Sequence, residues 1–354
     1  MRPACTIRRS LRRGWIAAAL GAVLIAVGIP AMPSEWPPAV NDRLPHFEPA
    51  PLAVPTGVPY QNADGAIRIV GYNDMRGILA RINALFQRAH PEFRFELILK
   101  GTRTAPDALA QGTSLLAPMG AEFSDAERID YARLTGTAPI LFRVAHDSLN
   151  PAALSAPLAI FVHRRNPLAR ISMEQVARVL VAAPDGIATW GQLGLGGEWA
   201  SRPIHLCGLA PSTALGRFMQ RRLGGRPFAE GFAGFPQSRE AVACVAADPL
   251  AIGFAAMNRG VPDVRVVPLS ERNGDAPSAG TQEDIMANRY PLDRHLLIYL
   301  RTDSQGRIDP VAREYMRLVL SYEGQREIAD EPLGYLPLNA RECAEALQRL
   351  STLK

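Results

Sequence analysis

The sequence predicts an α/β protein with largely parallel sheets. From residue 67 onward, segments with the two-residue period of strands alternate with segments that have the 3.6-residue period of helices. Small polar residues stand where several of these helices are expected to begin. With 354 residues, the chain is long enough for two domains or for one bilobed protein with a sizeable core.

The first 33 residues have the pattern of a secretory signal peptide. Arginines precede an apolar run from Trp15 to Ile29, and Pro-Ala-Met-Pro follows at 30–33. The run is shorter than the about 20 apolar residues that a membrane span needs. We therefore predict export to the periplasm or the extracellular space. Because Ile29 and Ala31 make an imperfect cleavage site, an uncleaved inner-membrane anchor is the alternative.

The net charge of the chain comes from this first segment. The formal net charge is +5, and residues 1–33 contain five arginines and no acidic residue, so +5 − 5 = 0 remains for residues 34–354. A neutral remainder gives no electrostatic reason to expect nucleic acid as a partner. We predict that the protein does not bind nucleic acid.

Strands and helices are expected in alternation after a linker. Residues 34–62 are rich in proline and predict a poorly ordered, partly extended linker. A strand is expected at 67–70. The next helix presents an apolar stripe with helical spacing, made of Ile78, Leu79, Ile82, Leu85 and Phe86. A second strand and a second helix follow, indicated by alternating Phe93, Phe95, Leu97 and Leu99 and by Pro106 and Gly112 at the helix ends.

The alternation continues to the C-terminus. Ser124 with Glu127, and Ser172 with Gln175, predict capping boxes at two helix starts. Residues 189–193 form a turn in which Trp190 is expected to be a packing anchor. Further strands are expected at 158–163, 204–208, 251–257 and 295–300, further helices at 213–223, 309–328 and 340–350, and a polar loop at 270–288.

The cysteines and histidines do not indicate a metal centre. After signal cleavage Cys207, Cys244 and Cys343 remain, and either a Cys207–Cys244 disulfide or three buried thiols fit an exported chain. The six histidines are scattered, and no cysteine or histidine spacing is typical of a metal site. Hydrolase and phosphate-loop motifs are absent from the sequence. We predict no enzyme activity, no catalytic residue, no metal and no cofactor.

Three turns that lead into helices indicate an anion site. They lie at 71–75, 101–105 and 208–215, and each combines glycine with hydroxyl or small residues. Backbone N–H groups at a helix start can hold an oxyanion without a metal. The alternative is that these residues are plain helix caps. Three such turns in one α/β chain favour a binding cleft.

The sequence of these turns resembles that of the phosphate-type substrate-binding proteins of ABC uptake systems. The resemblance covers residues 65–340 and lies in segments that follow one another in the family's order. They are GYNDM at 71–75, KGTRTAP at 100–106, GT at 112–113 with APM at 117–119, LAIFVH at 158–163 with NP at 166–167, TWGQL at 189–193, AIGF at 251–254, YPL at 290–292 and YLPL at 335–338.

The resemblance implies a bilobed periplasmic-binding-protein fold of the type II kind, with two sheets flanked by helices. Lobe I is expected at 63–157 plus 290–354 and lobe II at 158–289, with crossover strands 158–163 and 295–300 as the hinge. The resemblance also implies a small oxyanion, phosphate by family, bound between the lobes, and an ABC permease as partner of a monomer.

The ligand residues that the resemblance implies depart from the family pattern. They are Asn73, Asp74, Thr102, Arg103, Thr104 and Thr213. Thr102 and Thr104 keep the family's hydroxyl chemistry, but Asp74 replaces a neutral donor and would repel a phosphate dianion. Asp74 could instead pair with Arg103 or cap the first helix from the solvent side. A relative that no longer binds phosphate, and acts as a sensor, a scaffold or a receptor for another ligand, is the alternative function.

Overall fold

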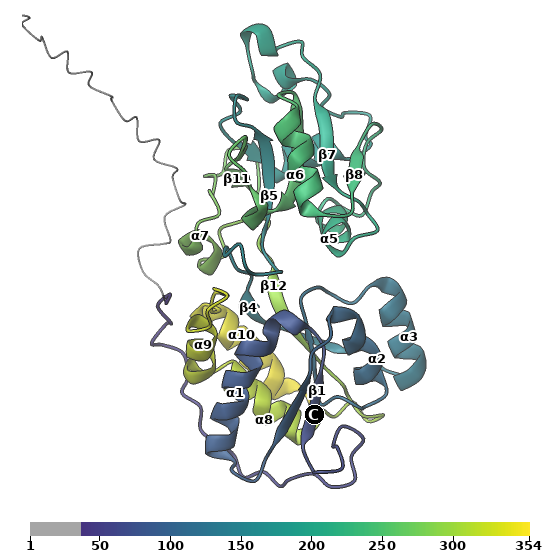
Figure 1. Cartoon of the computed structure of the whole chain (residues 1–354), viewed down its shortest axis with the longest axis vertical. Helices are drawn as coiled ribbons and strands as arrows, with labels where there is room; N and C mark the ends of the chain where they lie inside the picture. The colour runs from purple at the N-terminus through teal and green to yellow at the C-terminus, as the bar shows by residue number, and fades with distance from the viewer. Residues whose placement is uncertain (1–36) are drawn as a thin grey trace, which may run out of the picture. The chain divides into compact units, whose positions relative to one another are not determined.

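The strands and helices of residues 37–354 form two lobes, each with its own sheet and its own hydrophobic core (Figure 1). Residues 37–354 are the part of the chain that the computed structural model describes. The signal peptide predicted at 1–33 lies outside these residues. Among the described residues, no helix combines the length and the apolar character that a membrane span requires.

The first lobe is built on two groups of paired strands. A parallel pair joins β1 (Ile67–Val70) to β2 (Phe95–Ile98), and β12 (His295–Leu300) lies between β3 (Ala117–Met119) and β4 (Ile140–His146) in antiparallel pairing. The turn after β1 approaches β3 closely. Tyr72 donates its N–H to the carbonyl of Pro118 at 2.9 Å, and a Cβ on Gly71 would lie 2.4 Å from the same carbonyl oxygen.

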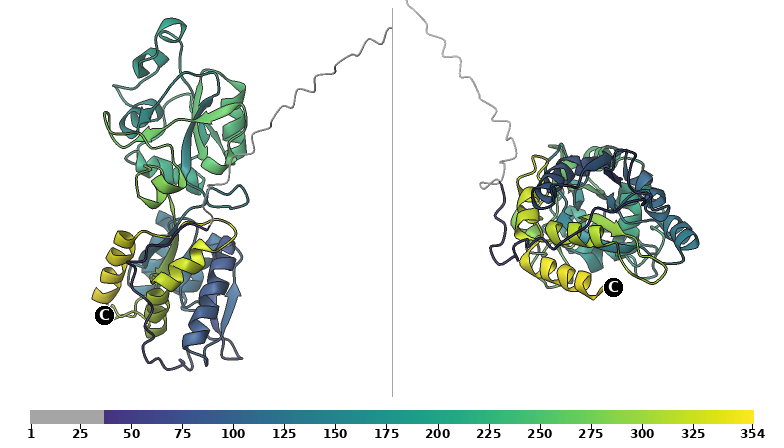
Figure 2. Two further views of the ribbon diagram at one scale, coloured as in Figure 1. Left: turned by 90° about the vertical axis from the view of Figure 1, so that its left-hand side faces the viewer. Right: turned by 90° about the horizontal axis from the view of Figure 1, so that it is seen from below.

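Helices from both ends of the sequence cover the first lobe. The predicted apolar stripe of α1 is buried at Ile78, Leu79, Ile82 and Phe86. Residue contacts join α1 to both α8 and α9, and α10 contacts α8 from its other side (Figure 2). The helices of this lobe are α1 (Arg76–Ala89), α2 (Ala105–Ala110), α3 (Asp125–Thr135), α8 (Pro310–Val319), α9 (Tyr322–Ala329) and α10 (Ala340–Thr352).

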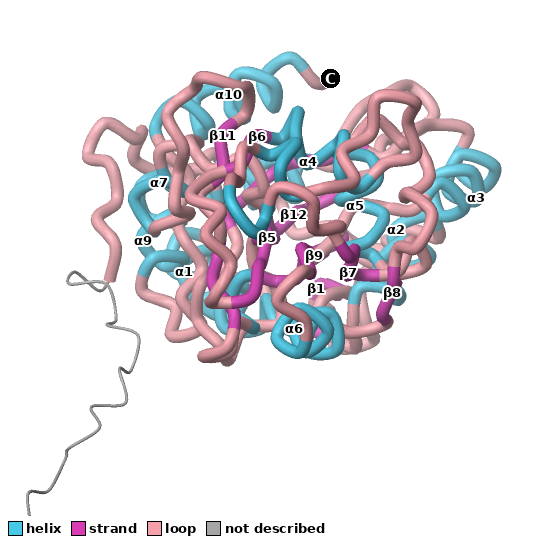
Figure 3. The backbone as a smooth tube through the Cα atoms, turned by 90° about the horizontal axis from the view of Figure 1, so that it is seen from above, coloured by secondary structure: helices cyan, strands magenta, loops and turns pink. Residues whose placement is uncertain are grey.

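The second lobe contains a sheet with the strand order β10-β5-β9-β7-β8. Helix α6 packs against β5, β7 and β9 of this sheet (Figure 3). The short strands β6 and β11 pair beside it. The elements are β5 (Leu158–His163), β6 (Ile171–Ser172), α4 (Met173–Leu180), β7 (His205–Leu209), α5 (Ala214–Arg222), β8 (Ala233–Phe235), α6 (Ser238–Ala247), β9 (Ala251–Ala256), β10 (Val264–Val266), β11 (Leu269–Ser270) and α7 (Gln282–Met286).

The chain passes between the lobes through residues 147–157 and through residues 287–294, which we call the crossing segments. The strands predicted as the hinge are β5 and β12, and each begins directly after a crossing segment. The lobe boundaries and the hinge function that the sequence indicated stay predictions.

Several expectations from the sequence were wrong in detail. The sheets are mixed rather than largely parallel, because β5 pairs antiparallel with β9 and β12 pairs antiparallel with β3 and β4. Buried central strands have the same apolar pattern in either direction. The helix expected at 309–328 is two helices, because Ser321 caps α9 by accepting the Gly324 N–H at 3.2 Å. The loop expected at 270–288 contains α7.

The proline-rich segment packs on the first lobe instead of extending freely. Residues 37–62 contain no helix or strand, which agrees with their composition. Val40, Leu44 and Tyr60 are nevertheless buried in the core of the first lobe. The backbone of this segment is also held, since Glu323 accepts the Phe47 N–H at 2.8 Å. The segment therefore belongs to the folded lobe from about Val40 onward.

Cys207 and Cys244 form a disulfide that joins β7 to α6, and Cys343 is a buried free thiol. This decides between the two alternatives that the sequence left open. The two cysteines are 37 residues apart in sequence, so the bond closes a loop of substantial length in the unfolded chain.

Replacing Cys207 and Cys244 together with alanine is expected to lower the free energy of unfolding by about 2–4 kcal/mol, because the unfolded chain gains the freedom that the closed loop denies it. Urea unfolding followed by circular dichroism measures the change. Dithiothreitol should destabilise the wild type by a similar amount and leave the double variant unaffected. Equal unfolding midpoints for wild type and variant under oxidising conditions would contradict the prediction.

Candidate functional site

Asp74 is buried inside the first lobe. Its side chain is 8% exposed, and Oδ2 accepts hydrogen bonds from the backbone N–H of Leu154 at 2.9 Å and from the hydroxyl of Tyr335. Burial raises the pKa of Tyr335, and the neighbouring Asp74 adds to this effect, so Tyr335 keeps its proton and donates it. Asp74 therefore fixes the crossing segment that contains Leu154.

These contacts correct the alternatives that the sequence offered for Asp74. It does not pair with Arg103 in the described residues, where neither an ion pair nor a side-chain hydrogen bond is found for Arg103. It does not cap the first helix from the solvent side either, since the helix start has no side-chain cap. The carboxylate that was expected to oppose an anion is already bound within the protein.

The predicted hydroxyl ligands are largely engaged in local structure. Thr104 donates to the carbonyl of Gly101 at 2.8 Å. Thr213 is the N-cap of α5, where its hydroxyl accepts the Gly216 N–H at 2.9 Å and donates to the carbonyl of Ala210 at 2.8 Å. Asn73 and Arg103 are exposed, and Thr102 is half-buried. A ligand at these turns would have to use Thr102, Arg103 or backbone N–H groups, and the role of the six residues stays a prediction.

A buried ion pair lies where the two crossing segments approach one another. Asp147 is fully buried, and its Oδ2 accepts from Arg294 Nη1 at 2.9 Å and from the hydroxyl of Ser155 at 2.8 Å. Arg294 also donates to the carbonyls of Ala156 at 3.1 Å and Gly120 at 2.7 Å. Burial raises the pKa of Asp147, and the positive charge of Arg294 opposes that effect.

The pair at Asp147 was not predicted. Each partner is one charged residue beside an apolar strand, and 147 residues separate them in the sequence. One indication of this pair was present in the sequence. Asp147 directly follows one apolar strand and Arg294 directly precedes another, and both lie in the crossing segments. The ring of Phe218 from α5 lies 5.5 Å from the Arg294 guanidinium, so Arg294 contacts both lobes.

A cavity of about 330 Å³ lies between the lobes and is rich in arginine; we call it the arginine pocket. Its arginines are Arg143, Arg217, Arg221, Arg222 and Arg294, and its carboxylates are Glu122, Glu271 and Asp293. Five guanidinium groups against three carboxylates leave a formal surplus of 5 − 3 = 2 positive charges. None of the six residues predicted from the sequence lines this pocket.

Two of these arginines have no carboxylate partner among residues 37–354. Arg221 pairs with Glu122 at 3.0 Å, Arg222 pairs with Glu271, and Arg294 pairs with Asp147. The guanidinium of Arg217 donates to the carbonyl of Ser212 at 2.7 Å, and Arg143 is exposed. When Asp147, the partner of Arg294, is counted with the three lining carboxylates, the formal surplus is 5 − 4 = 1, and Arg143 and Arg217 are the two pocket arginines without a carboxylate partner among these residues.

The sequence contained a signal for this pocket that we did not use. Arg217 and Arg221 lie four residues apart, so one face of a helix carries two arginines, and Arg222 directly follows them in sequence. The same helix begins at the third turn, where the anion was expected. The prediction from the turn at 208–215 therefore identified helix α5 correctly. It placed the anion at the first residues of α5, whereas the arginines that line the pocket lie one and two helical turns later.

Two α/β lobes, two crossing segments and a charged pocket between the lobes define the class of bilobed solute-binding proteins. The chain belongs to the PBP superfamily, because the family model described as "PBP superfamily domain" matches residues 58–323. The family resemblance and the bilobed fold predicted from the sequence are thereby confirmed. The family consists of substrate-binding proteins, not of a class of enzymes.

Similar proteins are known in several bacteria. A Pseudomonas aeruginosa protein named "Phosphate-binding protein PstS" is 29% identical over 300 residues, covering 82% of this chain and 90% of that protein. Among solved structures, an ABC-type phosphate transport receptor from Vibrio cholerae has a TM-score of 0.51 at 18% identity, covering 77% of this chain and 99% of that one. PstS from Borrelia burgdorferi has a TM-score of 0.51 at 16% identity with the same coverage. At these identities the two structures support the fold alone.

Proposed function

We propose that this chain is an exported solute-binding protein that holds a small oxyanion in the arginine pocket and delivers it to an ABC permease. The observation that carries the proposal is the pair of guanidinium groups, Arg143 and Arg217, that lack a carboxylate partner among the described residues. Phosphate is the first oxyanion to test, because the Pseudomonas relative is named for it.

The chemistry of the pocket favours an anion of this kind. A guanidinium presents donors in a planar fork that matches phosphate and carboxylate oxygens, and it stays charged at every physiological pH. Arg217 is half-buried and Arg143 is exposed, so solvent screens the charge of Arg217 less than that of Arg143. Two unpaired arginines can therefore hold one dianion without a metal. Asp74 does not line this pocket, so its carboxylate is not among the groups that face the anion.

The six predicted residues provide a second place for the same anion. Backbone N–H groups at the starts of α1, η2 (Thr102–Thr104) and α5 remain helix-start donors whatever their side chains do. In this arrangement Thr102 would add the hydroxyl and Arg103 the positive charge. The proposal of an oxyanion ligand holds in either place, and the two places differ in which variants lose affinity.

The alternative function is a relative that has lost phosphate binding and recognises another ligand or partner. The engaged hydroxyl of Thr213 favours it, as does the ring of Tyr72, which lies where a Cβ on Gly120 would be only 2.4 Å away. Under this reading, the pair between Asp147 and Arg294 and the ring of Tyr72 fill space that a family ligand would use.

Isothermal titration calorimetry with inorganic phosphate decides between the two functions. The proposal predicts that inorganic phosphate binds with a 1:1 stoichiometry. Absence of heat at millimolar phosphate would overturn the proposal and support the alternative function. Thr102→Ala is titrated in parallel, because loss of binding in that variant alone would place the anion at the predicted turns.

A further inference from the structure

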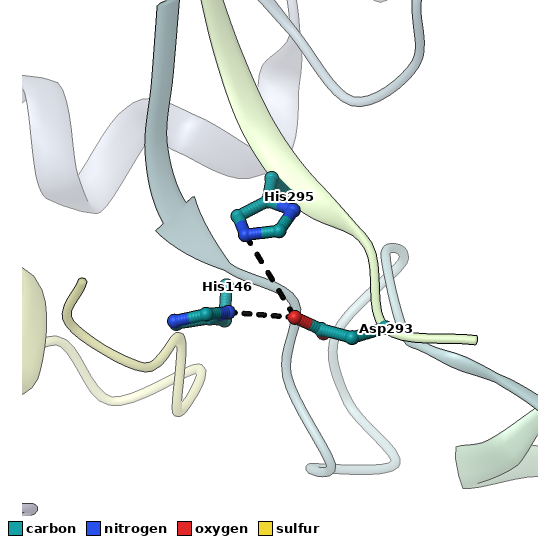
Figure 4. A group of neighbouring side chains, drawn as sticks. All are labelled: His146, Asp293 and His295. Atoms are coloured by element: carbon teal, nitrogen blue, oxygen red, sulfur yellow. Dashed lines mark hydrogen bonds and ion pairs between the residues drawn. The ribbon is translucent and has the colours of Figure 1, made fainter. Parts of the chain in front are cut away.

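Two histidines and two carboxylates from distant parts of the sequence meet beside the crossing segments. His146 ends β4, Asp293 lies in the second crossing segment, His295 begins β12, and Glu342 is in the first turn of α10. Their side chains are 0%, 5%, 10% and 13% exposed, respectively. Figure 4 shows His146 and His295 each directing a ring nitrogen at the same carboxylate oxygen of Asp293. Charged and polar groups of this kind are costly to bury unless they are paired or bind an ion.

Three of these groups converge on one small space. His146 Nδ1 lies 2.7 Å and His295 Nε2 lies 3.8 Å from Asp293 Oδ2, and the three donor atoms all lie within 4.8 Å of one another. In a tetrahedral zinc site, metal–ligand bonds of about 2.0–2.2 Å place the ligand atoms about 3.3 Å apart. The observed separations scatter around this value, so small side-chain rotations would bring all three atoms to one ion.

The fourth residue orients His146. Glu342 Oε2 lies 3.0 Å from His146 Nε2 and also accepts the Asn339 N–H at 3.0 Å, while Asn288 donates to Glu342 Oε1 at 2.8 Å. When His146 Nε2–H donates to Glu342, the lone pair of Nδ1 faces the oxygen of Asp293. At 2.7 Å only a proton fits between the two lone pairs, so a metal ion requires Nδ1 and Oδ2 to move apart to about 3.3 Å. A carboxylate behind a histidine is the usual outer partner of a metal-bound imidazole.

We propose that His146, Asp293 and His295 bind one divalent transition-metal ion, with Glu342 as the positioning residue for His146. Two imidazoles and a carboxylate are the donors that Zn²⁺ prefers, and a fourth position remains for water. The two carboxylates of the cluster balance the charge of the ion. Asp293 and His295 also line the arginine pocket, which provides a route from solvent.

An ion at this site would connect the two crossing segments. His146 precedes one crossing segment, and Asp293 and His295 stand at the end of the other, so one ion would tie the two crossing segments together. The alternative to a metal ion is a proton on His146 that is shared with Asp293 in a hydrogen bond. Burial lowers the pKa of His146, but hydrogen bonds to Asp293 and Glu342 outweigh burial and raise the pKa to about 9. A proton on His146 would hold the same side chains without a metal.

Cobalt substitution distinguishes a metal from a proton. We expect the chelator-treated wild type to bind one equivalent of Co²⁺, with visible absorption bands of a low-coordinate nitrogen and oxygen site, and Zn²⁺ to displace Co²⁺. His295→Ala should abolish the bands, and Glu342→Gln should weaken Co²⁺ binding about 10- to 100-fold. His205→Ala is the matched control, because His205 pairs with Asp248 at an exposed site and should not change the titration.

Thermal unfolding gives a second readout that does not depend on the variants. Zn²⁺ should raise the wild-type Tm, and the rise should increase with the logarithm of the Zn²⁺ concentration above the Kd, since a ligand that binds only the folded state stabilises it. Absence of cobalt bands at stoichiometric Co²⁺, together with an unchanged Tm, would overturn the proposal and leave the proton as the bridge. Equal Co²⁺ binding by wild type and His295→Ala would also overturn it. If His295→Ala does not fold, Glu342→Gln and the wild-type Tm decide.

Discussion

Asp147→Asn is expected to lower the free energy of unfolding by about 3–5 kcal/mol, because the substitution leaves the positive charge of Arg294 buried without a partner. Asp147 is fully buried, and the side chain of Arg294 is 7% exposed, so solvent cannot replace the lost carboxylate. Arg294 also holds the carbonyls of Ala156 and Gly120, and these contacts keep it from turning outward. Urea unfolding followed by circular dichroism measures the loss.

The control is an exposed ion pair of the same chemistry. Glu198→Gln removes a carboxylate that pairs with Arg202 at 2.9 Å in an exposed position, and we expect a change below about 1 kcal/mol. A double variant, Asp147→Leu with Arg294→Met, should recover much of the stability that Asp147→Asn loses, because it removes both charges. If Asp147→Asn is no more destabilising than Glu198→Gln, the pair does not stabilise the junction of the lobes.

Much of the fold could be predicted because local patterns decide it. The capping boxes at Ser124 and Ser172 are both present, and Trp190 is fully buried as expected for a packing anchor. These features depend on residues a few positions apart. The direction of a strand does not depend on such local residues. β12 is distant in sequence from β3 and β4, so its antiparallel pairing with them depends on the topology of the sheet and not on the local pattern.

The candidate site was less predictable for the same reason. The sequence drew attention to helix starts, where local hydroxyl groups are easy to recognise, but Thr104 and Thr213 serve their own turns. The buried groups near the crossing segments are pairs of distant residues. His146 and Asp293 are 147 residues apart, so the spacing rules that exclude local metal motifs could not detect them. The expectation of no metal therefore rested on sequence spacing alone.

The arginine pocket leads to the prediction with the largest expected effect on binding. Replacing Arg143 and Arg217 together with alanine is expected to raise the Kd for inorganic phosphate by about 10²- to 10⁴-fold. Each variant removes a charge-assisted hydrogen bond of about 1.5–3 kcal/mol, and about 1.4 kcal/mol corresponds to a tenfold change in Kd. Calorimetric titration of the wild type and the double variant at one salt concentration measures the difference.

Two comparisons make the result specific to the pocket. Arg164→Ala with Arg341→Ala removes the same number of positive charges from exposed ion pairs outside the pocket, and we expect the Kd to change less than about threefold. Arg143→Lys with Arg217→Lys keeps the charge but removes the planar fork, so it should recover only part of the affinity. If the double alanine variant binds phosphate as tightly as the wild type, the anion does not use the arginine pocket. The backbone donors at the three helix starts, with Thr102 and Arg103 beside them, would then be the remaining place for it.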